Sequence, residues 1–178
     1  MNINYLQVYD YDLNISKRLN ESIENLPNEW ICLTDQDTLK FPDFPNQLRE
    51  LLKDADKNWL IGTSVNRLRP NNPQVVYEMY KEDSISAHFD KSIELWSEYG
   101  TSLEPTNLIA GSCMIFHKEL WSKVKGFDED KIFFDKYFSY KVNEVGKCLI
   151  AKGIYIFHLY RWFADDPVSS VEHLIKKA

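Results

Sequence analysis

The order in which apolar patterns change along the chain most constrains this fold. Short continuous apolar runs, typical of buried strands, alternate with segments whose apolar residues recur at the helical period. A strand-like run over residues 4–9 is followed by helical spacing through residues 13–26, and then by the run WICL at residues 30–33. A second helix is predicted at 44–52 and a further strand at 59–65. This βαβαβ order predicts an α/β fold with a mostly parallel central sheet.

The second half of the chain continues the alternation less regularly. Residues 66–76 are rich in proline and asparagine and predict a loop, and residues 85–99 fit a surface helix. Further elements are predicted in this order: a buried strand at 110–117, a short helix at 118–124, a helix at 133–145, strands at 148–151 and 154–159, and a C-terminal helix that begins at Asp166 and Pro167.

Size and charge limit the function classes that fit this chain. With 178 residues, of which 44% are hydrophobic, it can bury one core, so we expect a single domain over residues 1–178. The net charge of -6 and the absence of a basic stripe argue against nucleic acid as a partner. No apolar run approaches the ~20 residues of a transmembrane helix, and the first residues lack signal-peptide features, so a cytoplasmic location is expected. Cys32, Cys113 and Cys148 lie in apolar runs and are expected to be buried, reduced thiols.

An acidic pair directly follows the apolar run at 30–33. Ligands of open α/β sheets bind outside the carboxyl ends of the strands, which is where Asp35 and Asp37 are expected. Two carboxylates in one loop can bind a hard cation such as Mg²⁺ or Mn²⁺, which in turn can bridge the phosphates of a nucleotide sugar. An acidic pair in a loop is by itself a weak signal, because most such pairs are only solvated.

Three segments, in the right order, resemble the family 2 glycosyltransferases of the GT-A fold. They are NISKRLNESIENLPNEWICLTDQDT, AGSCMIFHKELWSKVKGFDE and FFDKYFSYKVNEVGKCLIAKGIYIFHLYRW. The resemblance implies a three-layer α/β/α domain that moves a sugar from a nucleotide-sugar donor to a hydroxyl of a saccharide or other acceptor. It also implies a divalent metal cofactor, Mn²⁺ or Mg²⁺.

The resemblance implies specific roles for individual residues. Asp35, Asp37 and His158 would bind the metal, and Asp135 would be the general base. The donor diphosphate would be contacted by Asp35, Asp37, Asn14, Asn20 and Arg161, and the acceptor by Gly111, Ser112 and Trp162. The alternatives for two of these residues are structural, because Asp135 could only cap its helix and His158 could be an ordinary buried histidine. An imidazole ligand would favour Mn²⁺ over Mg²⁺. Asn66, Arg67 and Arg69 form a polar loop that is a weaker candidate for phosphate or acceptor contact.

The chain also departs from the family pattern. It begins where the strand after the family's nucleoside-binding βαβ unit should lie, so we expect an N-terminally shortened domain, and Phe134 occupies the place of a second acidic residue. One alternative is therefore a catalytically weak or inactive remnant that binds a carbohydrate or a protein partner. Another is a haloacid-dehalogenase-like phosphatase, with Asp35 as nucleophile. A homo-oligomer or a partner subunit could complete the donor site.

Overall fold

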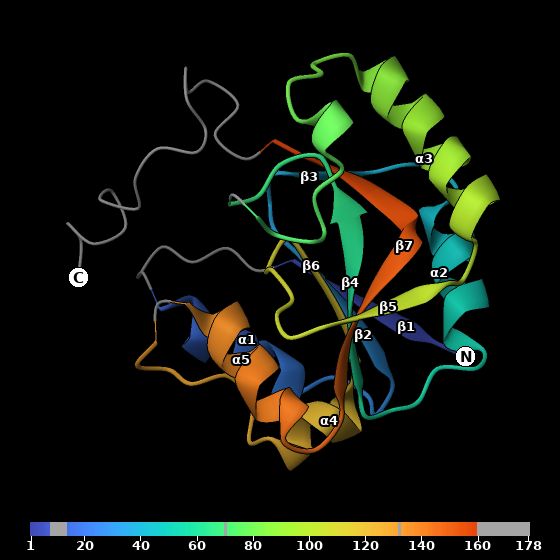
Figure 1. Cartoon of the computed structure of the whole chain (residues 1–178). Coiled ribbons are helices and arrows are strands. Elements are labelled where there is room, and N and C mark those ends of the chain that lie inside the picture. The colour runs from blue at the N-terminus through green and yellow to red at the C-terminus, as the bar shows by residue number, and fades with distance from the viewer. Residues whose placement is uncertain (8–13, 70, 132, 160–178) are drawn as a thin grey trace.

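The computed structural model describes residues 1–7, 14–69, 71–131 and 133–159, and within them a seven-stranded sheet carries helices on both faces (Figure 1). The strands are β1 (Ile3–Leu6), β2 (Trp30–Thr34), β3 (Thr38–Lys40), β4 (Trp59–Val65), β5 (Leu103–Thr106), β6 (Cys113–His117) and β7 (Lys147–His158). The helices are α1 (Ile15–Glu24), α2 (Phe44–Leu52), α3 (Ile85–Tyr99), α4 (Lys118–Lys123) and α5 (Phe134–Asn143), with a 3₁₀ turn at Tyr77–Met79.

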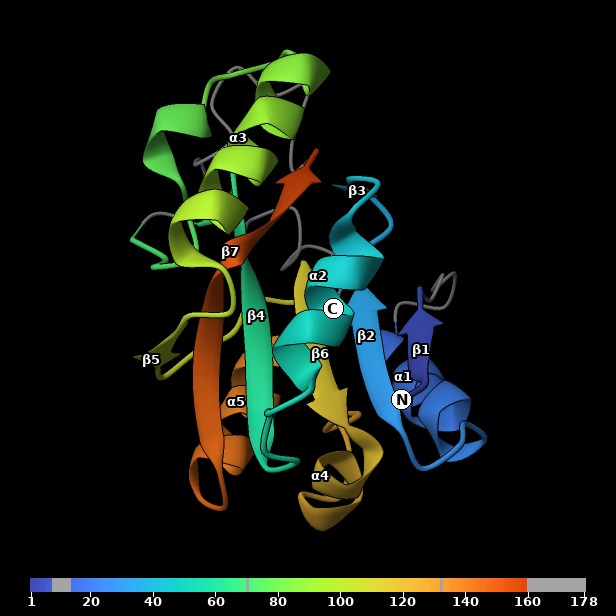
Figure 2. The same cartoon turned by 90° about the vertical axis from the view of Figure 1, so that its right-hand side faces the viewer.

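The strand order is β1-β2-β6-β4-β7-β3, and β5 pairs with β7 outside this path (Figure 2). Strands β1, β2, β4 and β7 share one direction, which confirms the predicted mostly parallel sheet. The other three strands run against them. In particular, β6 lies antiparallel between β2 and β4, so it brings the loop before Cys113 to the carboxyl end of β2.

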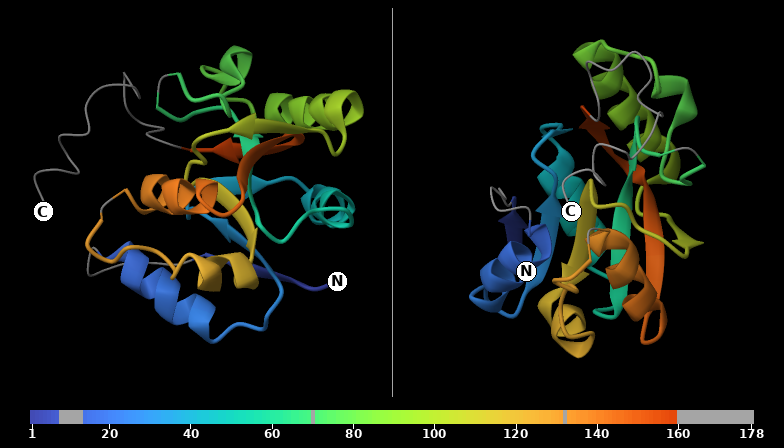
Figure 3. Two further views of the ribbon diagram at one scale, coloured as in Figure 1. Left: turned by 60° about the horizontal axis from the view of Figure 1, so that its bottom comes forward. Right: turned by 90° about the vertical axis from the view of Figure 1, so that its left-hand side faces the viewer.

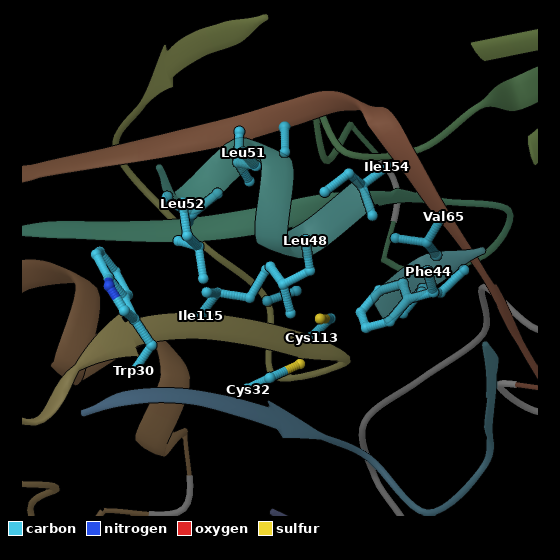
Figure 4. Close-up of a cluster of buried hydrophobic side chains, with 14 of the residues drawn as sticks. Trp30, Cys32, Phe44, Leu48, Leu51, Leu52, Val65, Cys113, Ile115 and Ile154 are labelled. Carbon is cyan, nitrogen blue, oxygen red and sulfur yellow. The ribbon is translucent and has the colours of Figure 1, made fainter. Parts of the chain in front are cut away.

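Two buried clusters of side chains hold helices to the two faces of the sheet. Helices α1, α4 and α5 cover one face, and α2 packs on the other (Figure 3). Helix α2 illustrates why its sequence folds this way, since Phe44, Leu48 and Leu51 recur at the helical period and are all buried against the sheet (Figure 4). Burial of side chains of this size stabilises the fold by about 1.5–3 kcal/mol each.

Several predicted elements differ in extent from the observed ones. The two strands predicted at 148–151 and 154–159 are one strand, β7, which is irregular where Ala151 pairs with Thr63 but Tyr155 pairs with Ser64. The strand predicted at 110–117 begins only at Cys113. Strands β3 and β5 were not predicted. The C-terminal helix predicted from Asp166 lies outside the described residues.

The three cysteines are free and buried, as predicted. Cys32 and Cys113 lie in the cluster under α2, and Cys148 lies in the cluster on the opposite face. Among the residues that the structure describes, no helix has the length and apolar character needed to cross a membrane.

Candidate functional site

The loop that follows β2 is held by backbone hydrogen bonds on two sides. The amide of Asp35 donates to the carbonyl of Ser112 at 3.2 Å, and the hydroxyl of Thr38 donates to the carbonyl of Asp35 at 2.7 Å. On the other side, the amide of Leu159 donates to the carbonyl of Asp37 at 2.8 Å. The acidic loop is therefore fixed between the segment before β6 and the end of β7.

Asp35, Asp37 and His158 meet at this edge of the sheet. Their ligand atoms all lie within 4.8 Å of one another. The Nε2 atom of His158 lies 3.2 Å from Asp37 Oδ1 and 4.0 Å from Asp35 Oδ2. The imidazole is buried, whereas the two carboxylate side chains are 45% and 46% exposed, so a ligand can reach them from solvent. The structure thus brings the three predicted metal ligands together.

The backbone fixes the orientation of the His158 ring. Its Nδ1 lies 2.9 Å from the carbonyl oxygen of Arg67, and since a carbonyl can only accept, Nδ1 carries a proton. The amide of His158 donates to Asn66 Oδ1 at 2.8 Å, which holds the backbone of the same residue. In the neutral ring, Nε2 then presents its lone pair towards the carboxylate of Asp37. This contact is favourable when a proton on Nε2 or a cation lies between the two atoms, so the three side chains can hold either a hydrogen bond or a divalent metal ion.

The two carboxylates differ in their electrostatic surroundings. Partial removal from solvent raises the pKa of Asp35 to about 6; the charge of His158 opposes this rise, and the charges of Asp37 and Asp135 add to it. Burial also acts to raise the pKa of Asp37, but the hydrogen bond and the charge of His158 outweigh it and leave the pKa lowered. A cation at this position would favour the ionised form of both groups.

Asp135 lies in the first turn of α5, close enough to Asp35 for its charge to affect the pKa of that group. Its Oδ2 accepts a hydrogen bond of 3.0 Å from the amide of Gly111. Gly111 precedes Ser112, whose carbonyl accepts from the Asp35 amide. The backbone of Gly111 and Ser112 therefore connects Asp135, the candidate base, to the loop that carries Asp35.

The protonation of Asp135 is also shifted. Burial raises its pKa, and the hydrogen bonds from the amides of Lys136 and Gly111, together with the charge of Arg69, only partly offset this rise. The N-cap position of α5 is Phe133, but Asp135 Oδ1 accepts a hydrogen bond of 2.8 Å from the amide of Lys136 in the first turn, so Asp135 also stabilises the start of the helix. A carboxylate with a raised pKa is a better proton acceptor than a fully solvated one.

Gly111 and Ser112, two of the three residues predicted to contact an acceptor, lie between these groups. A Cβ atom on Gly111 would lie 2.9 Å from Phe134 Cζ, so the lack of a side chain allows α5 to start close to this loop. Ser112 is buried, and its hydroxyl is one of the buried polar groups for which the structure shows no hydrogen-bond partner. The amide of Gly111 donates to Asp135, and the carbonyl of Ser112 accepts from the amide of Asp35. The sequence did not indicate these two hydrogen bonds.

The two asparagines, one at the N-cap of α1 and one within the helix, make hydrogen bonds to other parts of the protein. Asn14 caps α1 by accepting from the amide of Lys17 at 3.0 Å. The side-chain oxygen of Asn20 accepts from the amide of Phe127 at 2.9 Å and from Trp121 Nε1 at 3.3 Å. The bonds of Asn20 hold α1 to the Gly-Phe-Asp turn, and the contact of both residues with the donor diphosphate stays a prediction. The predicted Arg161 and Trp162 lie outside the described residues.

Comparison with known proteins shows the fold. No protein-family model matches this chain, and neither does any curated protein. A mannosyltransferase from Pyrobaculum calidifontis, solved with GDP-mannose and Mn²⁺, is similar over 82% of this chain with 16% identity and a TM-score of 0.52. GalNAc-T7, solved with UDP, GalNAc and Mn²⁺, is similar over 82% of the chain with 10% identity and a TM-score of 0.54. This chain covers 36% and 30% of those two chains, about a third of their length. The chain therefore has a GT-A-like glycosyltransferase fold, as the resemblance in sequence implied.

Proposed function

We propose that this chain is a metal-dependent glycosyltransferase domain that transfers a sugar from a nucleotide-sugar donor to a hydroxyl acceptor. The observation that carries the proposal is the convergence of Asp35, Asp37 and His158 at one edge of the sheet, with Asp135 beside them. Two solved structures of similar fold are described with Mn²⁺ and with GDP-mannose or UDP, which supports the same kind of ligand here.

The side chains of the proposed metal site suit the ion. Two carboxylates and one imidazole are donors that Mn²⁺ accepts well and that Mg²⁺ accepts less readily, because of the nitrogen ligand. The carbonyl of Arg67 holds Nδ1 of His158, so that Nε2 faces the two carboxylates. When bound, the ion would neutralise the charge that builds on the departing diphosphate.

The second part of the proposal concerns the acceptor. In an inverting transfer, Asp135 would remove the proton of the acceptor hydroxyl as that oxygen attacks the anomeric carbon. The raised pKa of Asp135 strengthens it as a proton acceptor, and the amide of Gly111 orients its carboxylate. The resemblance also assigns Gly111 and Ser112 to the acceptor pocket, and in the structure their backbone groups link Asp135 to the loop of Asp35.

A second candidate function is carbohydrate or partner binding without turnover of the donor. It is motivated by the span of the chain, which covers 36% and 30% of the two similar structures. A haloacid-dehalogenase-like phosphatase has less support, because the fold resembles glycosyltransferases and because β2 is flanked by the antiparallel strand β6.

Calorimetry with MnCl₂ and a panel of nucleoside diphosphates tests the proposal, followed by a screen of nucleotide sugars for Mn²⁺-dependent hydrolysis. We expect one nucleoside diphosphate to bind only when Mn²⁺ is present. Lack of binding by any diphosphate would contradict the donor site, and binding without turnover of any sugar would favour the second candidate. Phosphate release from a simple phosphomonoester, abolished in Asp35→Asn, would instead favour the phosphatase.

A further inference from the structure

Arg69 lies on the loop after β4, beside the start of α5. Its guanidinium carbon is 4.8 Å from the centroid of the Phe133 ring, and Phe133 is two residues before Asp135. Contact with an aromatic face restricts the plane of a guanidinium group and leaves its N–H donors at the rim. The side chain of Arg69 is exposed, so those donors point to where a ligand can reach them.

Arg69 differs from the other arginines that the structure describes. Arg18 donates to Glu21 at 3.1 Å, Arg49 donates to Asn46 at 3.2 Å, and Arg67 donates to Asp83 at 3.1 Å. Across the described ranges, no hydrogen bond or ion pair is found for the Arg69 guanidinium. Its donors suit a planar anion, and no group among the described residues uses them.

The contact with Phe133 places Arg69 near Asp135, two residues further along the chain. Its charge acts to lower the pKa of Asp135, which burial nevertheless leaves raised, and no ion pair forms between the two side chains. Arg69 thus lies near the residue to which the proposed function assigns the acceptor hydroxyl.

The acidic surroundings of the Arg69 guanidinium affect which ligands it would select. Asp35 and Asp37 are assigned to the cation, which leaves Asp135 as the carboxylate near Arg69, and an acidic molecule that approaches Asp135 needs a nearby positive group to bind. A guanidinium recognises carboxylate and phosphate by two parallel hydrogen bonds, which a neutral saccharide cannot accept in the same way. The arrangement thus favours a ligand that carries both a reactive hydroxyl and an acidic group.

We propose that Arg69 binds the carboxylate or phosphate of an acidic acceptor saccharide, such as a uronic acid or a sugar phosphate, beside the hydroxyl that faces Asp135. This inference rests on the proposed function and names its acceptor class. The same anion chemistry could also come from the donor diphosphate, so the experiment has one arm for each source.

The test uses the full chain and the variants Arg69→Gln and Arg69→Lys, with Arg49→Gln as the matched control on the exposed face of α2. In the first arm, calorimetry measures binding of UDP and GDP in the presence of MnCl₂. In the second arm, saturation-transfer NMR measures binding of glucuronic acid, glucose 6-phosphate and glucose. We expect the wild type to prefer the acidic sugars, and Arg69→Gln to bind them at least about tenfold more weakly with unchanged diphosphate binding. Arg69→Lys should recover part of the acidic preference, since it keeps the charge and loses the planar fork.

Other outcomes decide against the inference. Equal binding of acidic and neutral sugars by the wild type, or an unchanged preference in Arg69→Gln, would overturn it. Weaker diphosphate binding in Arg69→Gln with intact binding of acidic sugars would assign the guanidinium to the donor. Absence of Mn²⁺-dependent diphosphate binding in the wild type would count against the proposed function alone, because loss of acidic-sugar binding in Arg69→Gln would still support the role of Arg69.

Discussion

The Nε2 atom of His158 lies 3.2 Å from Asp37 Oδ1, although the two residues are 121 positions apart in the sequence. The short strand β3 makes this contact, because Thr38 pairs with His158 across the antiparallel ladder between β3 and β7. The proposed metal site therefore exists only in the folded chain, and a metal bound there is linked to folding.

We expect Mn²⁺ to raise the thermal stability of the protein. An ion that binds only the folded state at 100 times its Kd adds about 2.7 kcal/mol. For a domain of this size, each kcal/mol shifts Tm by roughly 2–4 °C. Differential scanning fluorimetry with MnCl₂, and again after addition of EDTA, measures the effect. An identical Tm in both conditions would argue against metal binding at this site.

Replacement of Asp37 should abolish binding of the metal and of the diphosphate while the fold remains intact. Changes outside the ligand shell of a metal typically cost roughly 10–100-fold in affinity, so loss of a ligand should cost more. Calorimetry of Asp37→Ala with MnCl₂ and the nucleoside diphosphate that the wild type binds tests this expectation. Asp54→Ala, which removes an exposed carboxylate just after α2, is the control. Wild-type affinity in Asp37→Ala would disprove the metal assignment.

Metal binding should weaken in mild acid. In the metal-free protein Asp35 has a pKa of about 6, so its carboxyl is mostly ionised at pH 7 and mostly protonated at pH 5. A protonated carboxyl must lose its proton before it binds a cation, so the apparent affinity for Mn²⁺ should be about tenfold lower at pH 5 than at pH 7. Titrations at these two pH values, with Asp35→Asn for comparison, would show it. An affinity that stays constant over this range would place Asp35 outside the metal site.

Helices and strands with strong local patterns could be predicted from the sequence. The bounds of α2, α3 and β4 agree with the predicted 44–52, 85–99 and 59–65, because apolar periodicity is a property of neighbouring residues. The position of Asp35 and Asp37 after a buried strand also follows from local sequence. From these features the class of fold and the location of the two acidic residues of the candidate site could be predicted.

Features that depend on distant partners could not be predicted in this way. Strand β3 has three residues and only partial burial, so it carries no pattern of its own and forms because β7 offers it a partner. Asn20 is a further example, since its side-chain oxygen accepts a hydrogen bond from the amide of Phe127, 107 positions away. Its place in the resemblance predicts a donor contact, which stays a prediction, and did not indicate that its side chain also holds the Gly-Phe-Asp turn.

Replacement of Asp135 by Asn should separate catalysis from donor binding. The amide oxygen can still accept from Gly111, and the shape is unchanged, but the side chain can no longer take a proton. We expect Mn²⁺-dependent diphosphate binding to persist and the rate of sugar transfer to fall by about 10²–10⁴-fold. Asp130→Asn, an exposed carboxylate whose visible partner is Lys131, serves as the control in the same assay. Full transfer activity in Asp135→Asn would remove it as the base.

A methyl group at residue 111 should disturb the site through the start of α5. In Gly111→Ala the new Cβ would lie 2.9 Å from Phe134 Cζ and 3.7 Å from Asp135 Cβ, so the Phe134 ring must move or the helix must shift. Overpacking of this kind costs about 1–3 kcal/mol of stability, and any shift lengthens the 3.0 Å bond from the residue 111 amide to Asp135. We therefore expect a lower transfer rate with nearly normal Mn²⁺ binding, measured beside urea unfolding. The double variant Gly111→Ala with Phe134→Leu should regain activity, because it removes the atom that the methyl group meets. A single variant as active as the wild type would show that the ring yields without moving Asp135.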